Sequence, residues 1–398
     1  MNKRMISLIS FVVALASLGN CRNDELSPGG FLTPTGALFQ GALIGSLLGT
    51  AGRGGFGFSV ENARNLVSSG GSLFLIGGTS TPVISQSNDG VTFTKRTVTL
   101  PGCTTVNTTV NTSDSFTECT ISGISKLGNQ LFVIGLKAEG NRNSISRSNT
   151  LYFASAETLE GLVFRQITDS NINPSNLTNF NILKTGAAPN VFAMGFSTSS
   201  NSHKVCATSD GGNSWNCRTP PAPSSTAGFI GTLNATFVYD QYYRWDGSWV
   251  DVTTTDRGFG SYFFSNGRTL KAGGNSLSFT TTDPSAWVNE TSFTTATNAS
   301  GNNVSSFYSS SSGLIGLGQG GNNNNSGALR TLSSDNGSTW TSGGVAQINN
   351  SGLSNSFYIS AVFYQNNYYQ LIQGNLNNNF TIKLFRSFDF SNWTEVPL

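Results

Sequence analysis

Four cysteines of this chain lie in two near pairs, and paired thiols either form disulfides or bind a metal. Cys103 and Cys119 are the first pair, and Cys206 and Cys217 flank a stretch with the composition of a tight hairpin. Four cysteines allow three pairings, and proximity favours joining each near pair. Zinc is the competing interpretation, but the chain has one histidine and no Cys-x-x-Cys spacing. We therefore expect two disulfides, an oxidising compartment, and neither metal nor cofactor.

Few other side chains could catalyse a reaction. His203 is the single histidine and lies in a Ser/Asn-rich stretch, so we expect an exposed loop residue rather than the base of a serine triad. A glycosidase needs two free carboxylates. The acids outside the turn motif described below are scattered: Asp114, Glu118, Glu139, Asp240 and Asp251. One aromatic cluster could stack on a sugar or a peptide, or form core: Tyr239, Tyr242, Tyr243, Trp245 and Trp249. The sequence assigns no catalytic residue and leaves enzymatic activity open.

The fifth cysteine, Cys21, follows a short apolar run. Two basic residues precede the apolar stretch 5–16, which is shorter than the roughly 20 residues of a membrane-spanning helix. The sequence Leu18-Gly19-Asn20-Cys21 resembles a bacterial lipoprotein processing site, in the relaxed form of spirochaete lipoproteins. The resemblance implies a signal peptide at residues 1–20 and a lipid on Cys21 that anchors the chain in a membrane. A secretory signal cleaved near Ala16 is the alternative.

Residues 21–57 show no strand alternation and are expected to form a lipidated tether, because Gly, Ser and Pro give flexible-linker chemistry. Within this segment, Gly41, Gly45 and Gly49 recur at every fourth position. That spacing leaves three interpretations open: a short helix, docking on the folded domain, or contact with the membrane.

A turn motif recurs from residue 58 to residue 398. Ser or Thr is followed two residues later by Asp, then by Gly or Ser, and then by Trp or Phe. The sharpest copies span Thr208–Trp215 and Ser333–Trp340. The acids of the motif are Asp89, Asp210, Asp246, Asp283, Asp335 and Asp389, with Glu157 in a degenerate copy. The aromatic residues are Phe93, Trp215, Trp249, Trp287, Trp340 and Trp393. The motif resembles the Asp box, or BNR repeat, of sialidase-like β-propellers.

This motif has the chemistry of a hairpin turn. An Asp side chain accepts hydrogen bonds from the backbone N–H groups that follow it, and Gly supplies a positive φ. The aromatic residue is then expected to fold over the turn and fill the gap between neighbouring blades. The motif residues are therefore interpreted as structural.

A short apolar strand precedes each copy of the motif, as at Leu73–Gly77, Leu131–Gly135 and Val191–Gly195. Continuous apolar runs are typical of strands buried on both faces. The two coupled repeats predict an all-β domain at residues 58–398, a seven-bladed β-propeller of four-stranded blades. Six or eight blades stay open, as does the way the ring closes. A β-helix or two sandwiches would also give short strands but would not explain both repeats.

The resemblance to sialidases implies a testable active site: three arginines that bind a carboxylate, a Tyr–Glu pair and an Asp acid. The expected Tyr/Phe-Arg-Ile-Pro stretch is absent from the sequence. Phe164-Arg165-Gln166-Ile167 is the nearest match, and it follows a motif copy instead of preceding one. The sequence therefore argues against sialidase activity.

Charge excludes one class of partner. Charged residues make up 11% of the chain, the net charge is +2, and no basic cluster stands out, so no nucleic-acid partner is expected. The leading hypothesis is a monomeric lipoprotein of the cell envelope, anchored in the outer membrane, whose propeller binds a protein or a glycan. A glycan-active enzyme (a glycosidase or lyase) and an envelope assembly factor are the alternatives.

Overall fold

The computed structural model describes 23 segments of the chain, and these are the residues to which every structural statement refers. They are residues 63–77, 81–103, 115–141, 147–169, 172, 181–188, 191–197, 203–219, 231–233, 237–239, 243–245, 247–251, 261–265, 268–273, 276–280, 288–289, 292–293, 303–320, 327–335, 337–346, 348, 352–377 and 379–398. The predicted signal peptide, Cys21 and the tether at 21–57 lie outside them, as do Asp246, Asp283 and Trp287.

The described strands form seven four-stranded antiparallel sheets, named A to G in chain order. Sheet A is β1 (Ala63–Ser69), β2 (Ser72–Gly77), β3 (Val83–Ser87) and β4 (Thr94–Thr97). Sheet B is β5 (Ser115–Leu127), β6 (Gln130–Asn141), β7 (Arg147–Ala156) and β8 (Arg165–Gln166). Sheet C is β9 (Asn181–Ala188), β10 (Val191–Ser197), β11 (His203–Thr208) and β12 (Asn216–Arg218). Sheet D is β13 (Gly231–Leu233), β14 (Phe237–Tyr239), β15 (Tyr243–Trp245) and β16 (Trp249–Asp251).

The last three sheets follow the same order. Sheet E is β17 (Ser261–Ser265), β18 (Arg268–Gly273), β19 (Ser276–Thr280) and β20 (Val288–Asn289). Sheet F is β21 (Asn303–Ser310), β22 (Gly313–Gly320), β23 (Gly327–Ser333) and β24 (Thr341–Ala346). Sheet G is β25 (Ser354–Tyr364), β26 (Asn367–Leu376), β27 (Asn379–Ser387) and β28 (Thr394–Val396). Each sheet is built from consecutive strands, so none borrows a strand from another part of the described chain.

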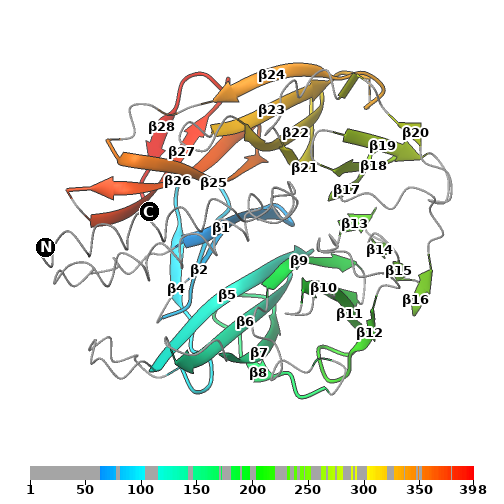
Figure 1. Ribbon diagram of the computed structural model, residues 1–398, viewed down its shortest axis with the longest axis vertical. Helices are drawn as coiled ribbons and strands as arrows, with labels where there is room; N and C mark the ends of the chain where they lie inside the picture. The colour runs from blue at the N-terminus through cyan, green and yellow to red at the C-terminus, as the bar shows by residue number, and fades with distance from the viewer. Residues whose placement is uncertain are drawn as a thin grey trace, which may run out of the picture.

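The sheets are arranged radially around a common centre (Figure 1). The first strand of each sheet contacts the next sheet: β5 contacts β9, β9 contacts β13, β13 contacts β17, and β17 contacts β21. Strand β2 contacts β5, β22 contacts β25, and β25 contacts β1, which closes the circle. The predicted all-β propeller is therefore confirmed.

Strand β2 shows why this sequence forms radial sheets. All six of its residues, Ser-Leu-Phe-Leu-Ile-Gly, are buried. Successive side chains of a strand point to opposite faces, and here Phe74 and Ile76 join the apolar cluster shared with sheet B. Leu73 and Leu75 join the cluster shared with sheet G. An apolar run in the second strand thus stabilises both neighbours of a sheet, by about 1.5–3 kcal/mol for each fully buried side chain.

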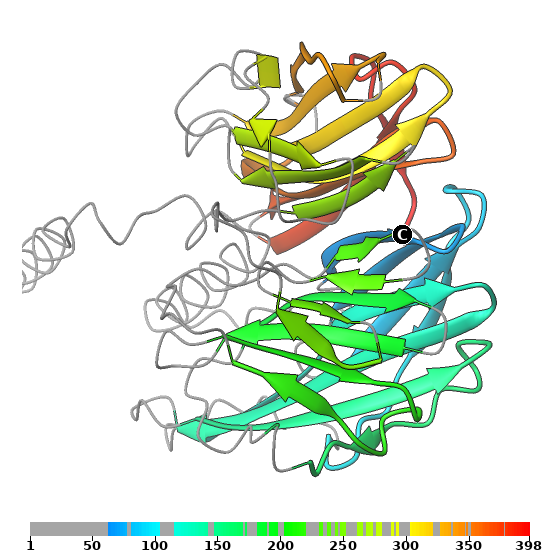
Figure 2. The same cartoon turned by 90° about the vertical axis from the view of Figure 1, so that its right-hand side faces the viewer.

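The two rims of the ring differ in their connections. In a sheet of four consecutive antiparallel strands, the first and third turns lie at one end, and the second turn and the connection to the next sheet lie at the other. The hairpins β5–β6 and β21–β22 both turn on the right-hand side of Figure 2. We call this side the hairpin face and the opposite side the loop face. The fourth strand of each sheet ends, and the first strand of the next sheet begins, at the loop face; the sequence intervals between them are residues 98–114, 167–180, 219–230, 252–260, 290–302 and 347–353.

The wide spacing between the first two motif acids, Asp89 and Glu157, predicts a loop that carries both Cys103 and Cys119, and the structure shows that this prediction is wrong for Cys119. Cys119 lies in strand β5, which has 13 residues and pairs with the 12 residues of β6 along its length, from Leu127 with Gln130 to Ser115 with Asn141. Polar and apolar residues alternate along this stretch, as expected for a strand that has one buried face. The hairpin β5–β6 therefore accounts for much of the long first interval between motif copies.

Candidate functional site

The described acids of the turn motif lie on the hairpin face, between the third and fourth strands of their sheets. In sheet A, the Ser87 hydroxyl donates to Asp89 Oδ1 over 2.8 Å, and the same oxygen accepts the backbone N–H groups of Val91 and Thr92 over 2.8 and 2.7 Å. The Gly90 N–H donates to Ser87 Oγ over 2.8 Å. The Ser87 hydroxyl and these three backbone N–H groups thus each have an acceptor within three residues.

The other three described Asp turns repeat this arrangement. Asp210 Oδ1 accepts the Thr208 hydroxyl over 2.8 Å and the Ser214 N–H over 3.0 Å. Asp335 Oδ1 accepts the hydroxyl of Ser333 and the N–H of Thr339, and Asp389 Oδ1 accepts the hydroxyl of Ser387 and the N–H groups of Ser391 and Asn392. The degenerate copy of sheet B differs, because Glu157 is exposed and Thr158 closes the turn through Gly161 N–H.

These hydrogen bonds stabilise the ionised carboxylates and lower their pKa values. The Ser214 hydroxyl and backbone N–H lower the pKa of Asp210 to about 2. Desolvation raises the pKa of Asp335, but donation from Thr339 outweighs it and brings the value to about 2. The backbone N–H groups of Thr92 and Asn392 hold the pKa values of Asp89 and Asp389 below their ordinary range. A carboxylate held ionised and capped by turn donors is suited to fixing a hairpin rather than to general acid catalysis.

The aromatic residues of the motif pack between sheets. Trp215 is buried and meets Phe153 of sheet B edge-on, with ring centroids 5.6 Å apart. Trp340 meets Phe293 in the same way at 5.2 Å, and Trp249 packs against Trp245 in the cluster that sheet C shares with sheet D. Phe93 and Trp393 are partly buried against the clusters at the two faces of sheet G.

Two residues that sequence reasoning missed link these aromatic residues to the preceding sheet. Asp169 lies three residues after β8, and its Oδ2 accepts the backbone N–H of Trp215 over 2.9 Å. Ser292 lies three residues after β20, and its hydroxyl accepts the backbone N–H of Trp340 over 2.9 Å. Both residues are polar and lie three positions after the fourth strand of a sheet. This pattern is the sequence signal that could have identified them.

A third missed residue is Arg330 on β23. Its guanidinium carbon lies 4.5 Å from the ring centroid of Phe390 and 5.1 Å from that of Tyr368, both in sheet G. Its Nε donates to the Gly343 carbonyl over 3.2 Å. Phe390 takes a left-handed φ of 69° at the position that Gly90 occupies in sheet A, and cation–π contact with Arg330 helps to hold it there.

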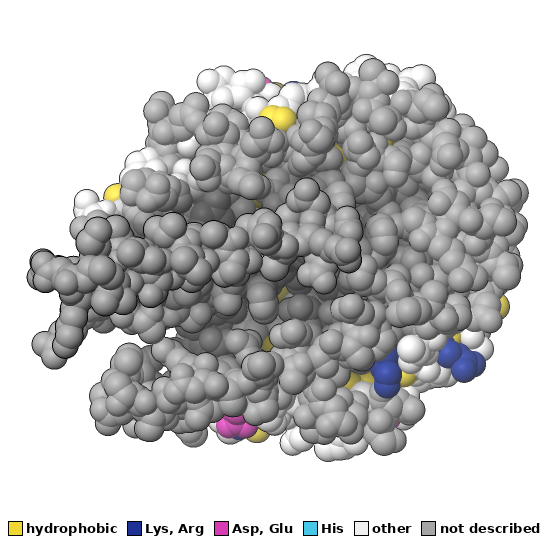
Figure 3. Space-filling model, viewed as in Figure 1, with side chains coloured by type: hydrophobic (Ala, Val, Ile, Leu, Met, Phe, Trp, Pro, Cys, Tyr) yellow, Lys and Arg dark blue, Asp and Glu magenta, His cyan; other side chains and the backbone are white. Residues whose placement is uncertain are grey.

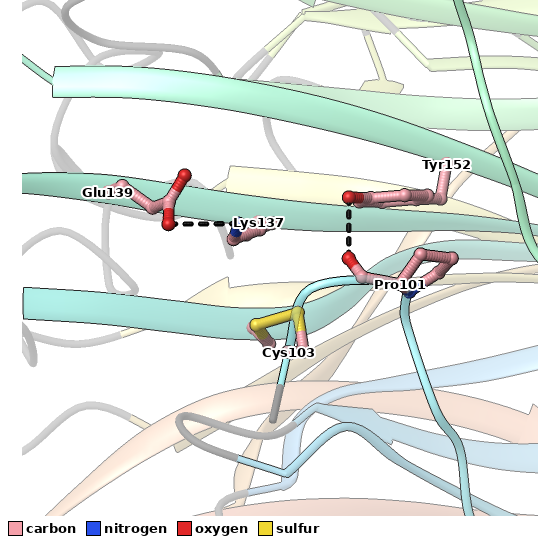
Figure 4. The surroundings of a disulfide bond; sticks show 6 residues. Pro101, Cys103, Lys137, Glu139 and Tyr152 are labelled. Carbon is pink, nitrogen blue, oxygen red and sulfur yellow. Dashed lines mark hydrogen bonds and ion pairs between the residues drawn. A yellow bond between two sulfur atoms is a disulfide. The ribbon is translucent and has the colours of Figure 1, made fainter. Parts of the chain in front are cut away.

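On the loop face, a disulfide between Cys103 and Cys119 fixes the segment that leaves sheet A to strand β5 of sheet B (Figure 4). The buried side chain of Leu100 packs where Gly135 of β6 leaves room, since a Cβ at Gly135 would lie 2.6 Å from a Leu100 methyl. The Tyr152 hydroxyl donates to the Pro101 carbonyl over 2.7 Å. Segment 98–103 is thus held by one covalent bond and by independent polar and apolar contacts.

The same sheet surface carries the described ionisable groups nearest to this disulfide. Lys137 Nζ lies 2.9 Å from Glu139 Oε1, and the two side chains are 14% and 44% exposed. Burial raises the pKa of Tyr152, Lys137 lowers it and Glu139 raises it, so the phenol stays protonated and donates to Pro101. Lys137 and Glu139 bind each other and Tyr152 binds Pro101, and of the ion pair the Glu139 side chain is the more exposed.

The second disulfide, Cys206–Cys217, joins residues that lie directly opposite each other on β11 and β12. Both expected disulfides are thus present. Two disulfides indicate an extracellular or cell-envelope protein. Among the described residues, no helix is long and apolar enough to cross a bilayer, and no three potential metal-ligating side chains gather into a cluster.

Those of the remaining candidate residues that the structure describes lie in sheets B, C and D. His203 is the first residue of β11 rather than a residue of a hairpin loop, because its backbone pairs with Ser197 of β10. In the aromatic cluster, Trp245 and Trp249 are buried against sheet C. Glu118 and Asp251 are strand residues, whereas Asp114, Asp240 and Tyr242 lie outside the described residues. Figure 3 shows Lys and Arg side chains near one edge of this view, and those of the described residues form no basic stripe there.

Comparison with solved structures gives likenesses at low sequence identity. Trypanosoma rangeli sialidase in complex with the inhibitor DANA has a TM-score of 0.43 and 12% identity, over 81% of this chain and 54% of that one. The same sialidase with 2,3-difluoro-KDN gives 0.45 and 13%, over 82% and 53%. A glycosyl hydrolase from Bacteroides ovatus gives 0.35 and 12%, over 72% and 87%. The chain thus spans about half the length of the sialidase. No protein-family model and no curated protein matches it.

Proposed function

We propose that this protein is a lipid-anchored propeller of a bacterial cell envelope that binds a glycan or protein ligand through its loop face. One observation carries the proposal: the two faces of the ring are built differently. On the hairpin face, the described motif carboxylates accept the backbone N–H groups of their own turns, as at Asp89 and Asp210. On the loop face, each fourth strand ends and the first strand of the next sheet begins, and binding residues are commonly found on loops that a rigid scaffold positions.

The disulfide Cys103–Cys119 and the Lys137–Glu139 pair support the choice of face. Preorganised loops lose less conformational entropy on binding than flexible loops do. The Cys103–Cys119 disulfide fixes the start of one inter-sheet connection to β5. Glu139 then offers a half-exposed carboxylate, a hydrogen-bond acceptor for sugar hydroxyls or peptide N–H groups.

The binding test compares the two faces of the full chain with Cys21→Ser, which prevents lipidation. Two matched variants each receive one exposed cysteine that is labelled with a bulky maleimide: Thr99→Cys on the loop face and Asn129→Cys on the hairpin face. Both are screened against a panel of acidic and neutral oligosaccharides and host proteins, with product analysis for glycan cleavage. The proposal expects binding that the Thr99 label abolishes and the Asn129 label spares. Cleavage of a glycan would instead establish the enzyme.

The anchor is tested separately in cells that make the full chain. With Cys21 intact, we expect incorporation of labelled fatty acid and partition into detergent; Cys21→Ala should lose both. Protease treatment of intact cells then distinguishes a surface-exposed propeller from a periplasmic one. Unlabelled protein with Cys21 intact would support the secretory alternative.

A further inference from the structure

The junction between sheets G and A differs from the other junctions of the ring. Consecutive sheets such as A and B are joined by the polypeptide itself, whereas sheets G and A are the last and first of the described chain. Neither of the two disulfides crosses this junction, since one lies between β5 and the segment after β4 and the other lies within sheet C. Among the described residues, closure of the ring at G–A therefore depends on non-covalent contacts.

A compact set of hydrogen bonds crosses this junction on the hairpin face. The Tyr364 hydroxyl donates to the carbonyl oxygens of Gly71 and Asn88, over 2.9 and 2.8 Å. Gln365 Nε2 donates to the same Asn88 carbonyl over 2.8 Å and to the Tyr364 hydroxyl over 3.1 Å. Two residues of one hairpin in sheet G thus bind two turns of sheet A at once.

The backbone of the donor hairpin is unusual. Gln365 and Asn366, at the turn between β25 and β26, have φ values of 46° and 58°, whereas the matching turn of sheet A uses Gly70 and Gly71. A left-handed conformation costs a side-chain-bearing residue such as Gln roughly 1 kcal/mol relative to Gly. A glycine at 365 would avoid this cost but would lack the amide that reaches Asn88.

Packing completes the junction. Tyr369 is fully buried, and its hydroxyl occupies the space over Gly90, where a Cβ would lie 1.8 Å away. Leu66 and Leu73 of sheet A join Val362 and Leu371 of sheet G in one apolar cluster. The Leu66 N–H also donates to Ser360 Oγ over 3.3 Å.

We propose that the ring of the propeller opens first at the G–A junction. Tyr364, Gln365 and Asn88 stabilise the closed form of this junction. Opening at any other junction leaves the two sheets tethered by the chain. Within the described residues no chain connection joins sheets G and A, so the free energy of opening there depends on the side chains of Tyr364 and Gln365 and on the Asn88 carbonyl that they bind. Local opening of this kind is detected by amide hydrogen exchange.

The test is hydrogen–deuterium exchange on the full chain, with Tyr364→Phe compared with Tyr152→Phe. Each substitution removes one tyrosine hydroxyl that donates to backbone carbonyl oxygen, across G–A in the first case and onto segment 98–103 in the second. Tyr364→Phe removes the one hydroxyl hydrogen that the Gly71 and Asn88 carbonyls share, so it should speed exchange in β1 and β25 about fivefold and leave β6 and β7 unchanged. Tyr152→Phe should leave β1 and β25 unchanged.

Gln365→Gly provides a second variant, because glycine tolerates the φ of 46° and the hairpin is retained. It should speed exchange in the same two strands. The proposal is overturned if either variant at the junction leaves β1 and β25 as slow as in the parent. It is also overturned if exchange rises equally in all seven sheets, or if Tyr152→Phe accelerates β1 and β25 to the same degree.

Discussion

The backbone N–H of Trp215 donates to Asp169 Oδ2 over 2.9 Å, and the two residues belong to different sheets of the ring. Asp169 lies three residues after β8, the outer strand of sheet B, while Trp215 ends the acid-anchored turn of sheet C, directly before β12. Ser292 and Trp340 repeat the relationship between sheets E and F. The turn motif is therefore fixed from two directions: by its own carboxylate and by a polar side chain of the preceding sheet.

We predict that Asp169→Ala lowers the free energy of unfolding by about 1–2 kcal/mol, because it leaves the Trp215 N–H without its acceptor. Urea denaturation followed by Trp fluorescence measures the change. Asp169→Asn keeps a carbonyl oxygen and should retain much of the stability. Equal stability of the Ala variant and the parent would contradict the assigned role.

Stability should depend on pH through the turn carboxylates. The pKa values of Asp210 and Asp335 fall from 3.8 to about 2 in the folded protein, so folding favours their ionised forms. Their contribution is complete above the unfolded pKa and is lost as pH falls from about 4 to about 2. We expect the melting temperature to fall in that window and Asp335→Asn to weaken the fall. Glu157→Gln, at the exposed turn of sheet B, is the control and should leave the profile unchanged.

Gly90→Ala should destabilise the protein strongly. Gly90 has a φ of 74°, and the added methyl would overlap the buried Tyr369 hydroxyl at 1.8 Å. Strain and overpacking together should cost about 2–4 kcal/mol. Gly71→Ala is the matched control, since its φ is 71° with nothing within 4 Å of the new Cβ. It should cost about 1 kcal/mol. Similar losses in both variants would show that Tyr369 does not occupy that space.

Trp340→Ala should cost about 3–5 kcal/mol, because its ring is buried in the cluster with Phe293 and Phe307. Trp393→Ala should cost less, because Trp393 is only partly buried beside its cluster. Thermal unfolding of the two variants under the same conditions compares them. A larger loss at Trp393 would contradict the burial seen here.

The sequence was informative where the interactions are local. Each Asp89 and Asp210 turn contact described here joins residues at most four positions apart, and the apolar second strands are continuous runs that a short window detects. Asp169 could not be found in this way, because its partner lies 46 positions later and is a backbone N–H that any residue provides. The loop predicted at Cys119 rests on the spacing of the motif copies and is wrong, because β5 is a half-exposed strand in which polar residues are mixed with apolar ones.

The candidate site was the least predictable part. Glu139 stood in the sequence as one of several scattered acids, and only the antiparallel pairing of β6 with β5 and β7 sets its strand beside Cys119 and Tyr152. The link from Pro101 to Tyr152 spans 51 positions. Contacts of this kind depend on register across sheets, which residue type alone does not reveal.

Because every sheet is completed by strands adjacent in the chain, one unit can be copied, deleted or exchanged without breaking the ladder of any other. Such a ring is open to growth by duplication of a single gene segment. It also suits chimeras, in which a foreign blade replaces a native one provided that its two apolar faces match the neighbours it must meet.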